Sequence, residues 1–244
     1  MKRLAPYSQH LLRGTDLIKE LVGHSNIKKT DMVYDIGAGT GAITAVLATR
    51  ARYVLAIESE PRMAAKLREN MEHYPQVEVI EGDFLKMPLP KAPYKIFSNI
   101  PFHISSQIVR KLVESEYPPE AAYLIVQRQF ARKLLIGEVE FTGLLGATIA
   151  PWFMAKIKRP LRRSDYTPPP NVDTVLIELK PRPEPALPRK DMARYQAMLE
   201  DCFSDPKKFT KTPRKQTGIP EDIKPSQMSL AQWVMLFQAV KSGQ

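Results

Sequence analysis

A glycine-rich turn between an apolar strand and a helix is the feature that most constrains the fold of this chain. We expect the strand over Val33–Ile36 and the helix over Ala42–Ala48, with Gly37, Gly39 and Gly41 between them. Because glycine has no Cβ, the backbone can approach a ligand closely, and the helix amino terminus behind the turn favours a negative group. The spacing Asp-x-Gly-x-Gly-x-Gly suits S-adenosylmethionine (SAM), but the turn also satisfies the looser dinucleotide pattern G-x-G-x-x-A. The turn therefore predicts an α/β fold and leaves both ligands open.

Acidic residues follow two further apolar segments. Tyr53–Ile57 is expected to form a second buried strand, and Glu58 at its end could accept hydrogen bonds from both ribose hydroxyls of a ligand. A third segment, Val77–Gly82, leads to Asp83, which could accept a hydrogen bond from the adenine amine of SAM. Each acid alone is more often a solvated loop charge. Ligands of open α/β sheets bind at the carboxyl ends of the strands, however, so the successive strand ends together predict one crevice.

The next expected strand, over residues 94–98, is followed by Asn99-Ile100-Pro101-Phe102. Methylation of an exocyclic amine on a flat ring needs two acceptors that draw the amine hydrogens out of the ring plane. Asn99 and the Ile100 carbonyl could supply them, because Pro101 fixes its own φ and restricts Ile100 to extended conformations. Phe102 could then stack on the ring. The alternative is a proline turn that ends a strand, with Phe102 in the core.

These motifs together resemble the rRNA adenine N6-methyltransferases of the erythromycin-resistance (Erm) group and of the housekeeping KsgA group. The resemblance extends nearly end to end. Besides the glycine turn, Glu58, Asp83 and the tetrapeptide, the matching segments are Ser8–Leu12, Leu124–Gln127, Phe130–Leu135 and Asp165–Leu176. Asn-Ile-Pro-Phe is closer to Erm, because the housekeeping enzymes usually carry Leu and Tyr at the second and fourth places. His10 stands where the group more often has Asn, and Phe102 replaces the commoner Tyr.

The resemblance implies SAM-dependent methylation of one adenine in the peptidyl-transferase region of 23S rRNA, which would confer resistance to macrolide, lincosamide and streptogramin B antibiotics. It implies a cofactor site formed by His10, Leu12, Gly37, Gly39, Gly41, Glu58, Asp83 and Asn99. It implies a catalytic site formed by Asn99, Ile100, Pro101 and Phe102. The Ser8–Leu12 segment resembles the part of these enzymes that closes over SAM. Phe102 lacks the phenol hydroxyl, so no phenolic base is required.

Charge is consistent with an RNA substrate. The chain has 36 Lys and Arg against 26 Asp and Glu, a formal net charge of +10. Phosphate-contacting proteins need such a surplus, although many basic proteins bind no nucleic acid. The surplus is concentrated in residues 156–163 and 207–215, which contain five basic residues each and no acid. The candidate RNA-binding residues in them are Lys158, Arg159, Arg162, Arg163, Lys207, Lys208, Lys211, Arg214 and Lys215.

Two domains are expected. Residues 180–188 contain four prolines, too many for a helix interior or a central strand. We therefore predict a catalytic domain over 1–180, with a Rossmann-like doubly wound sheet that ends in an antiparallel strand, and a small helical, RNA-contacting domain over 181–244. Apolar residues at helical spacing predict one helix around Met192–Phe203 and another around Leu230–Val240, the latter with a capping box at Ser229.

Cysteine and histidine limit the other chemistry. The single cysteine, Cys202, excludes an internal disulfide framework and a site with several thiolates, and four scattered histidines show no metal spacing. A zinc deaminase is disfavoured for the same reason. We expect a cytoplasmic monomer with no metal and no membrane segment. Three alternatives stay open: the housekeeping small-subunit (16S) dimethyltransferase, an NAD-binding dehydrogenase, which would leave Asn99–Phe102 unexplained, and a non-catalytic RNA-binding protein.

Overall fold

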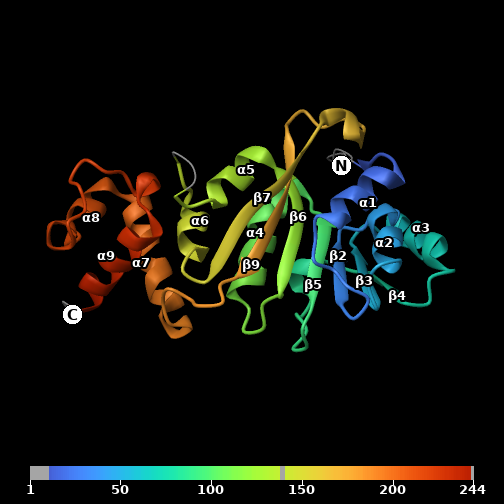
Figure 1. Ribbon diagram of the computed structural model, residues 1–244, viewed down its shortest axis with the longest axis horizontal. Coiled ribbons are helices and arrows are strands. Elements are labelled where there is room, and N and C mark those ends of the chain that lie inside the picture. The colour runs from blue at the N-terminus through green and yellow to red at the C-terminus, as the bar shows by residue number, and fades with distance from the viewer. Residues whose placement is uncertain (1–10, 138–140, 243–244) are drawn as a thin grey trace, which may run out of the picture. The chain divides into compact units, whose positions relative to one another are not determined.

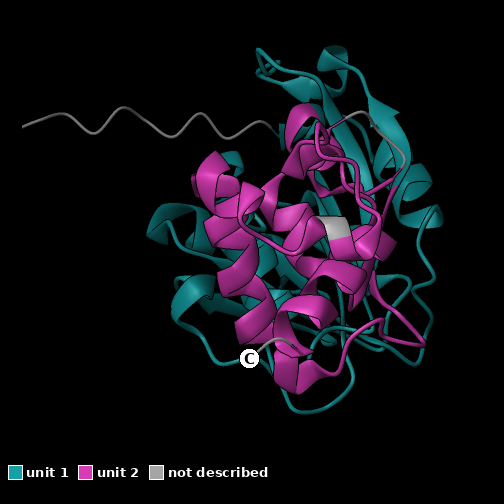
Figure 2. Cartoon of the chain, turned by 90° about the vertical axis from the view of Figure 1, so that its left-hand side faces the viewer, with its two compact units in different colours: residues 1–128, 157–178 teal, residues 129–156, 179–244 magenta. Residues whose placement is uncertain are grey.

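A computed structural model describes residues 11–137 and 141–242 of the chain (Figure 1). The chain forms two compact units, which Figure 2 shows in different colours. The first unit contains residues 1–128 and 157–178, and the second contains residues 129–156 and 179–244. The chain therefore passes from one unit to the other three times.

A seven-stranded sheet is the largest element of the fold, and its order is β4-β3-β2-β5-β6-β9-β7. Its strands are β2 (Met32–Ile36), β3 (Tyr53–Glu58), β4 (Val77–Glu81), β5 (Lys95–Asn99), β6 (Ala121–Gln127), β7 (Phe153–Leu161) and β9 (Thr174–Pro181). The five strands from β4 to β6 pair in parallel. Two short strands, β1 (Leu11–Leu12) and β8 (Tyr166–Thr167), form a separate antiparallel pair.

The sheet closes with antiparallel strands, as predicted. The backbone N–H of Arg128 donates to the Asp173 carbonyl, so the carboxyl end of β6 lies beside the amino end of β9. At the other end of β9, the N–H of Arg182 donates to the Trp152 carbonyl just before β7. Both neighbours of β9 therefore run opposite to it. The expected Rossmann-like α/β fold is confirmed, with a mixed sheet.

Helices alternate with the parallel strands. The α-helices are α1 (Thr15–Gly23), α2 (Ala42–Ala48), α3 (Pro61–Met71), α4 (Ser105–Glu114), α5 (Arg128–Leu134), α6 (Leu144–Ile149), α7 (Met192–Ser204), α8 (Pro206–Thr210) and α9 (Leu230–Ser242). Short 3-10 helices are η1 (Phe84–Lys86), η2 (Phe102–Ile104), η3 (Arg163–Asp165), η4 (Arg189–Asp191), η5 (Arg214–Thr217) and η6 (Pro225–Gln227).

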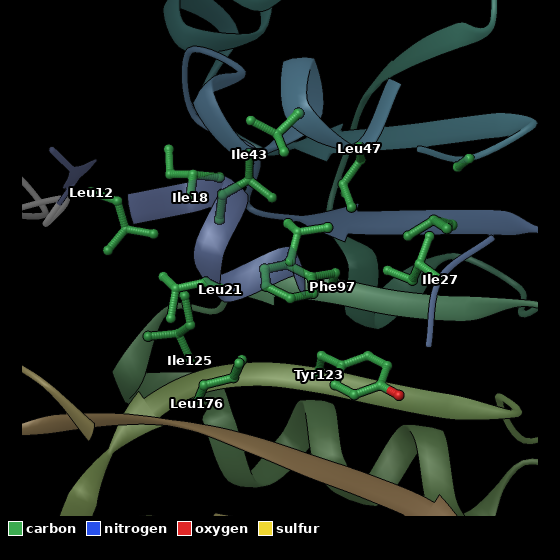
Figure 3. Packing of buried hydrophobic residues seen from close by; sticks show 14 of the residues in the cluster. Leu12, Ile18, Leu21, Ile27, Ile43, Leu47, Phe97, Tyr123, Ile125 and Leu176 are labelled. Atoms are coloured by element: carbon green, nitrogen blue, oxygen red, sulfur yellow. The ribbon is translucent and has the colours of Figure 1, made fainter. Parts of the chain in front are cut away.

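The main core of the first unit lies between the sheet and helices α1 and α2 (Figure 3). Ile18 and Leu21 of α1 and Ile43 of α2 pack toward the side chains of Phe97 and Ile125 in the sheet. Alternate residues of β6 contribute to this cluster, as the period of two in a strand requires. Burial of this apolar surface supplies most of the driving force for the unit and fixes the strand ends relative to one another.

Aromatic rings form much of the core of the second unit. The Tyr195 and Phe237 rings meet edge to face at a centroid distance of 5.3 Å, and those of Phe203 and Trp233 stack at 5.9 Å. These contacts join α7 to α9. Cys202 is buried in α7, and burial raises the pKa of its thiol to about 11, which agrees with the packing role expected of it.

Expected and observed elements agree closely in the first unit. The helix at Ala42–Ala48 has the predicted bounds, and the strands differ from prediction by one or two residues at their ends. The capping box is present, since the Ser229 N–H donates to Gln232 Oε1 and the Gln232 N–H donates to Ser229 Oγ. Residues 182–188 form neither helix nor strand.

The division of the chain differs in one respect from the expected one. The last change of unit falls between residues 178 and 179, near the expected boundary at 180, but residues 129–156 belong to the second unit rather than to the first. Those residues include α5 and α6, and α6 packs with α7 through the hydrogen bond from the Tyr195 hydroxyl to the Ala147 carbonyl.

In the described parts of the chain, no helix is long and apolar enough to cross a membrane.

Candidate functional site

The glycine turn has a backbone that side chains would disrupt. Gly37, Gly39 and Gly41 have φ values of 69°, 58° and 94°, a region that residues with a Cβ rarely adopt. A Cβ on Gly41 would lie 2.7 Å from the Leu67 Cδ1 atom of α3. The N–H groups of Gly37 and Ala38 both donate to the Ile57 carbonyl, which ties the turn to the end of β3.

The Glu58 side chain also holds the glycine turn in place. Its side chain is buried, with 2% exposed, and accepts hydrogen bonds from the backbone N–H groups of Gly39 at 2.8 Å, Ser59 at 2.8 Å and Glu60 at 2.9 Å. A carboxylate has about four acceptor positions. One is left for a ligand hydroxyl, whereas the sequence interpretation had Glu58 bind two. Glu58 therefore shapes the glycine turn through its three backbone donors.

Asp83 lies at the neighbouring strand end, where the Gly82 N–H donates to the Glu58 carbonyl at 2.9 Å. Its Oδ1 atom accepts the Leu85 N–H at 2.9 Å and so caps η1, while the side chain stays 45% exposed. Lys111 of α4 donates to the Leu85 carbonyl at 2.8 Å, which holds this loop against α4. The cap orients the Asp83 carboxylate and leaves it open to a ligand amine.

The Asn99–Phe102 segment meets the glycine turn directly. A Cβ on Gly37 would lie 3.3 Å from Pro101 Cδ, closer than ordinary van der Waals contact. Asn99 ends β5, the Ile100 side chain is buried with 1% exposed, and Phe102 is half-buried at the start of η2. The Pro101 carbonyl accepts from the Ile104 N–H and the Ser105 hydroxyl. The structure thus brings together the glycine turn and the Asn99–Phe102 segment.

Three buried polar residues link these two segments, and our sequence interpretation gave none of them a role. The Thr44 hydroxyl donates to Asp35 Oδ2 at 2.7 Å, and the Ile36 N–H donates to Ser98 Oγ at 2.7 Å. Burial raises the pKa of Asp35 to about 7, the Thr44 hydroxyl lowers it, the nearby Glu58 raises it and the Ser98 hydroxyl lowers it. Asp35 opens the Asp-x-Gly motif and could have been singled out, whereas a lone Ser in an apolar strand gives no signal.

Leu12 has a different environment from the one expected. The predicted role was contact with the cofactor, but its side chain is 9% exposed and packs in the main core with Ile18 (Figure 3). Its strand β1 pairs with β8, with Leu12 opposite Tyr166. His10, the other cofactor residue expected from this segment, lies outside the described residues.

The basic residues around β7 are mostly ion-paired. Arg159 donates to both carboxylate oxygens of Glu20, at 2.6 and 3.0 Å. Lys158 lies 3.5 Å from the Glu178 carboxylate, and Arg163 lies 3.3 Å from that of Asp173. Arg162 is exposed. A residue that sequence reasoning missed, Arg128, lies 4.0 Å from the other oxygen of Asp173 and so joins Arg163 in one cluster.

The basic residues around α8 differ among themselves. Lys207 and Lys211 are exposed, and Lys208 contacts Asp201 at 2.5 Å. Arg214 is buried, with 6% exposed; its guanidinium lies over the Phe209 ring and donates to the Glu221 carbonyl at 2.9 Å. We therefore withdraw Arg214 from the expected RNA-contacting set. The Lys215 side chain lies outside the described part of the structure. Over the described ranges 11–137 and 141–242, no three His, Cys, Asp or Glu side chains gather as metal ligands would.

Relatives by sequence carry two kinds of name. A dimethyladenosine transferase of Yarrowia lipolytica is 32% identical over 201 residues, which cover 80% of this chain and 62% of the relative. An rRNA adenine N-6-methyltransferase of Lysinibacillus sphaericus is 32% identical over 238 residues, which cover 96% of this chain and 95% of the relative. The chain spans 53% to 62% of the length of the first curated relatives it matches, which are dimethyladenosine transferases.

Solved structures agree with the fold. The crystal structure of the 23S rRNA methyltransferase ErmE is 29% identical, with a TM-score of 0.81, over 95% of this chain and 99% of the other. A dimethyladenosine transferase from Plasmodium falciparum has the same fold at a TM-score of 0.78 and 23% identity, over 96% and 98% of the two chains. Residues 2–220 match the family described as ribosomal RNA adenine dimethylase, and the chain belongs to that family.

Proposed function

We propose that this protein uses SAM to methylate the exocyclic N6 amine of one adenine in 23S rRNA, in the peptidyl-transferase region, and that this modification confers macrolide, lincosamide and streptogramin B resistance. The observation that carries the proposal is the contact between Gly37 and Pro101, because it sets a cofactor loop against a pair of amine acceptors. Family membership argues against the dehydrogenase interpretation.

The residues of the site fit SAM. Three glycines with positive φ form a cradle at the amino terminus of α2, and the buried Glu58 offers one further acceptor beside it. Asp83, oriented by its cap on η1, is the acceptor for the adenine amine. SAM supplies a methyl group on a sulfonium, which is electrophilic without a metal or a base.

The protein's own residues contribute by positioning the target amine. Asn99 and the Ile100 carbonyl accept hydrogen bonds from the target amine and direct its lone pair toward the methyl group. An aryl amine needs no deprotonation before it attacks, because its proton becomes acidic once the methyl is attached. Phe102 stacks on the adenine, which must leave any base stack to reach the site. Alignment and acceptors matched to developing positive charge account for the rate.

The RNA backbone contacts are assigned to basic residues on each unit. On the first unit these are Lys158, Arg159, Arg162 and Arg163, to which we add Arg128. On the second unit, within the helical region 181–244, they are Lys207, Lys208, Lys211 and Lys215. Their affinity for RNA should fall steeply with salt. We propose that the protein acts as a monomer in the cytoplasm.

A second candidate is dimethylation of adenine in 16S rRNA, since the first relatives matched are dimethyladenosine transferases. Two observations favour the 23S target. The structural relative ErmE, a 23S rRNA methyltransferase, matches 95% of this chain at 29% identity and a TM-score of 0.81. The Phe at position 102 and the Ile at position 100 also agree with the Erm pattern.

Transfer of labelled methyl from SAM to protein-free 23S and 16S rRNA, measured in parallel with primer extension, tests the proposal. Modification of a single 23S adenine in the peptidyl-transferase loop is the expected result. Label in 16S rRNA alone would move the protein to the housekeeping function. Label in neither RNA would overturn methylation of rRNA.

The roles of Asn99 and Phe102 can be tested in the same assay. Asn99→Ala should lower kcat by about 10²-fold while SAM affinity changes little, because the amide aligns the amine rather than the cofactor. Phe102→Tyr should keep most of the activity and Phe102→Ala should lose most of it, since the stacking face is what matters. Equal loss of turnover and SAM affinity in Asn99→Ala would refute the assigned role.

A further inference from the structure

The two central strands of the site stop pairing before they end. The β2–β5 register pairs Val33 with Lys95 and Tyr34 with Ile96. By contrast, β2 pairs with β3 as far as Ile36, and β5 pairs with β6 as far as Asn99. The backbone pairing between β2 and β5 therefore ends two residues before the carboxyl end of β2, at the sheet edge where ligands of α/β folds bind.

A side chain spans this separation. The Ile36 N–H would need a carbonyl partner on β5, and it donates instead to Ser98 Oγ at 2.7 Å. Ser98 has no exposed surface, so water cannot replace the hydroxyl. Ile36 directly precedes Gly37, and Ser98 directly precedes Asn99. The bond therefore joins the two segments one residue away from each half of the site.

A buried hydrogen bond beside this contact joins β2 to the start of α2. The Asp35 residue precedes Ile36 in β2, and the nearby Ser98 hydroxyl lowers the pKa of its carboxyl. Asp35 accepts the Thr44 hydroxyl at 2.7 Å, and both side chains are buried, with 1% and 0% exposed. Thr44 thus ties α2 to β2 at the residue next to the one that bonds to Ser98.

A second contact acts between the same segments. The position that a Cβ would take on Gly37 lies 3.3 and 3.4 Å from Pro101 Cδ and Cγ, so the proline ring leaves no room there for a side chain. The ring therefore limits how closely the segments can approach. The bond from Ile36 to Ser98 limits how far they separate. Together, the proline ring and the Ile36–Ser98 bond determine the distance between the glycine turn and the Asn99–Phe102 segment.

We propose that Ser98 is a positioning residue that sets the distance between the glycine turn and the Asn99–Phe102 segment, and so between the methyl group and the amine. The inference rests on the proposed function. In-line transfer needs the reacting atoms about 3–3.5 Å apart, and a misplacement of 1 Å can cost about 10²-fold in rate. Ser98 touches neither reactant in this role. Its loss should therefore lower turnover more than it lowers affinity for either ligand.

Three substitutions of Ser98 distinguish the effect of losing the hydroxyl from the effect of changing the side-chain volume. Ser98→Ala removes the acceptor, Ser98→Cys replaces it with a weak one of similar size, and Ser98→Thr keeps it. Thr148→Ala is the matched control, because it removes a buried hydroxyl that bonds to the Leu144 carbonyl in the second unit. For each variant we would measure kcat with 23S rRNA, Kd for SAM by calorimetry, and the amide signal of Ile36 by NMR.

The expected result is a kcat lowered about ten- to a hundredfold in Ser98→Ala and Ser98→Cys, with Kd for SAM within about threefold of wild type. The Ile36 amide proton should shift upfield in both, as a lost hydrogen bond requires. Ser98→Thr should restore the amide signal and most of kcat. Thr148→Ala should keep kcat even if it unfolds at a lower temperature.

Other outcomes overturn the inference. An unchanged kcat in Ser98→Ala, or equal losses of kcat and SAM affinity, would show that the hydroxyl does not set the spacing. Failure of Ser98→Thr to recover activity while the Ile36 amide recovers would also overturn it. A wild-type protein that binds SAM but methylates no rRNA would instead refute the proposed function, and with it the role of Ser98 in turnover.

Discussion

Polar side chains gather at both ends of the strands of the first unit, and the two groups differ in burial and in charge. The carboxyl-end network consists of Asp35, Thr44, Glu58 and Ser98. The amino-end network consists of Asn26, Asp31, Lys95, Tyr123 and Glu178. In the first network, two carboxylates are held by hydroxyls and backbone N–H groups. In the second, an ammonium group offsets a carboxylate.

The amino-end network is complete without a ligand. Lys95 Nζ lies 2.7 Å from Asp31 Oδ2 and also donates to the Asn26 carbonyl at 3.1 Å, with 5% of the lysine exposed. Such a pair is tolerated in the interior because each charge has a partner and further hydrogen bonds. The pair connects the start of β5 to the loop before β2, so its role is structural.

The carboxyl-end network keeps negative charge that no cation of its own offsets. Glu58 is held by dipoles alone, through three backbone N–H groups, and Asp35 has a pKa raised to about 7 by burial. A ligand that brings hydroxyl donors and a positive sulfonium suits this end of the sheet. The difference teaches that a fold can pair its charges at one edge of a sheet and leave them without a cation at the other, where we propose that the cofactor binds.

The largest expected effect comes from breaking the amino-end pair. Lys95→Met should lower the free energy of unfolding by about 2–3 kcal/mol, because it leaves the Asp31 carboxylate, which is 14% exposed, with the Lys28 N–H but without its ammonium partner. Denaturant unfolding would measure the loss. The affinity of the folded protein for SAM should not change, which isothermal calorimetry would check.

A double variant serves as the control for that prediction. Replacing both members of the pair, Lys95→Met with Asp31→Leu, should recover much of the stability, because no charge stays buried and unpaired. If Lys95→Met weakened SAM binding as strongly as it weakened the fold, the division of labour between the two networks would be wrong.

The next effect concerns pH at the carboxyl-end network. The pKa of Asp35 is raised from its ordinary value of 3.8 to about 7, so between those values the native state binds more protons than the unfolded state. The free energy of unfolding therefore loses this contribution as pH rises through the window. Asp35→Asn removes the ionisation. Its stability relative to wild type should rise between pH 4 and pH 8, by on the order of a few kcal/mol.

An acid with the opposite shift gives the matched comparison. The hydrogen bond from Arg159 lowers the pKa of the exposed Glu20, so that carboxylate stabilises the fold above its ordinary pKa and loses this contribution as pH falls. Glu20→Gln should therefore lose stability relative to wild type at neutral pH and not in acid. If the stability of both variants relative to wild type changed in the same direction with pH, the raised pKa of Asp35 would be contradicted.

Local signals in the sequence were sufficient for the binding edge of the sheet. The turn at Gly37–Gly41 is marked by three glycines between an apolar run and a helical run, and both elements formed within one residue of prediction. Glu58 was placed at a strand end by the same reasoning, and it lies there. Glycines between two segments and alternating apolar residues are patterns formed by residues close together in the sequence. They can therefore be interpreted without knowledge of the fold.

Features that depend on distant partners could not be predicted. Two runs with equal numbers of basic residues look alike in sequence, yet Arg159 is paired with Glu20 of α1 and Arg214 is buried on Phe209. Charge runs carry no information on which side of an element faces solvent. Residues 129–156 belong to the second unit through contacts with helices 40 or more residues away, such as the bond from Tyr195 to Ala147.

The smallest expected effect comes from the hydroxyl in the middle of the amino-end network. The Tyr123 hydroxyl accepts the Asn26 N–H at 3.0 Å and donates toward Glu178 at 2.9 Å. Tyr123→Phe removes these bonds and the contact of the hydroxyl with Asn26 Oδ1 at 3.0 Å, but keeps the ring, which stacks on Phe97 at a centroid distance of 6.1 Å. We expect a loss of about 1–2 kcal/mol in the free energy of unfolding, measured by denaturant titration.

Tyr53→Phe is the control for this substitution, because its hydroxyl contacts Glu78 at an exposed position. Water can replace that partner, so the loss there should stay below about 0.5 kcal/mol. Turnover should be unchanged in both variants, because neither hydroxyl belongs to the carboxyl-end network. A fall in kcat for Tyr123→Phe without a fall in stability would mean that the two ends of the sheet are coupled, and that the amino-end network contributes to the site through the strands between them.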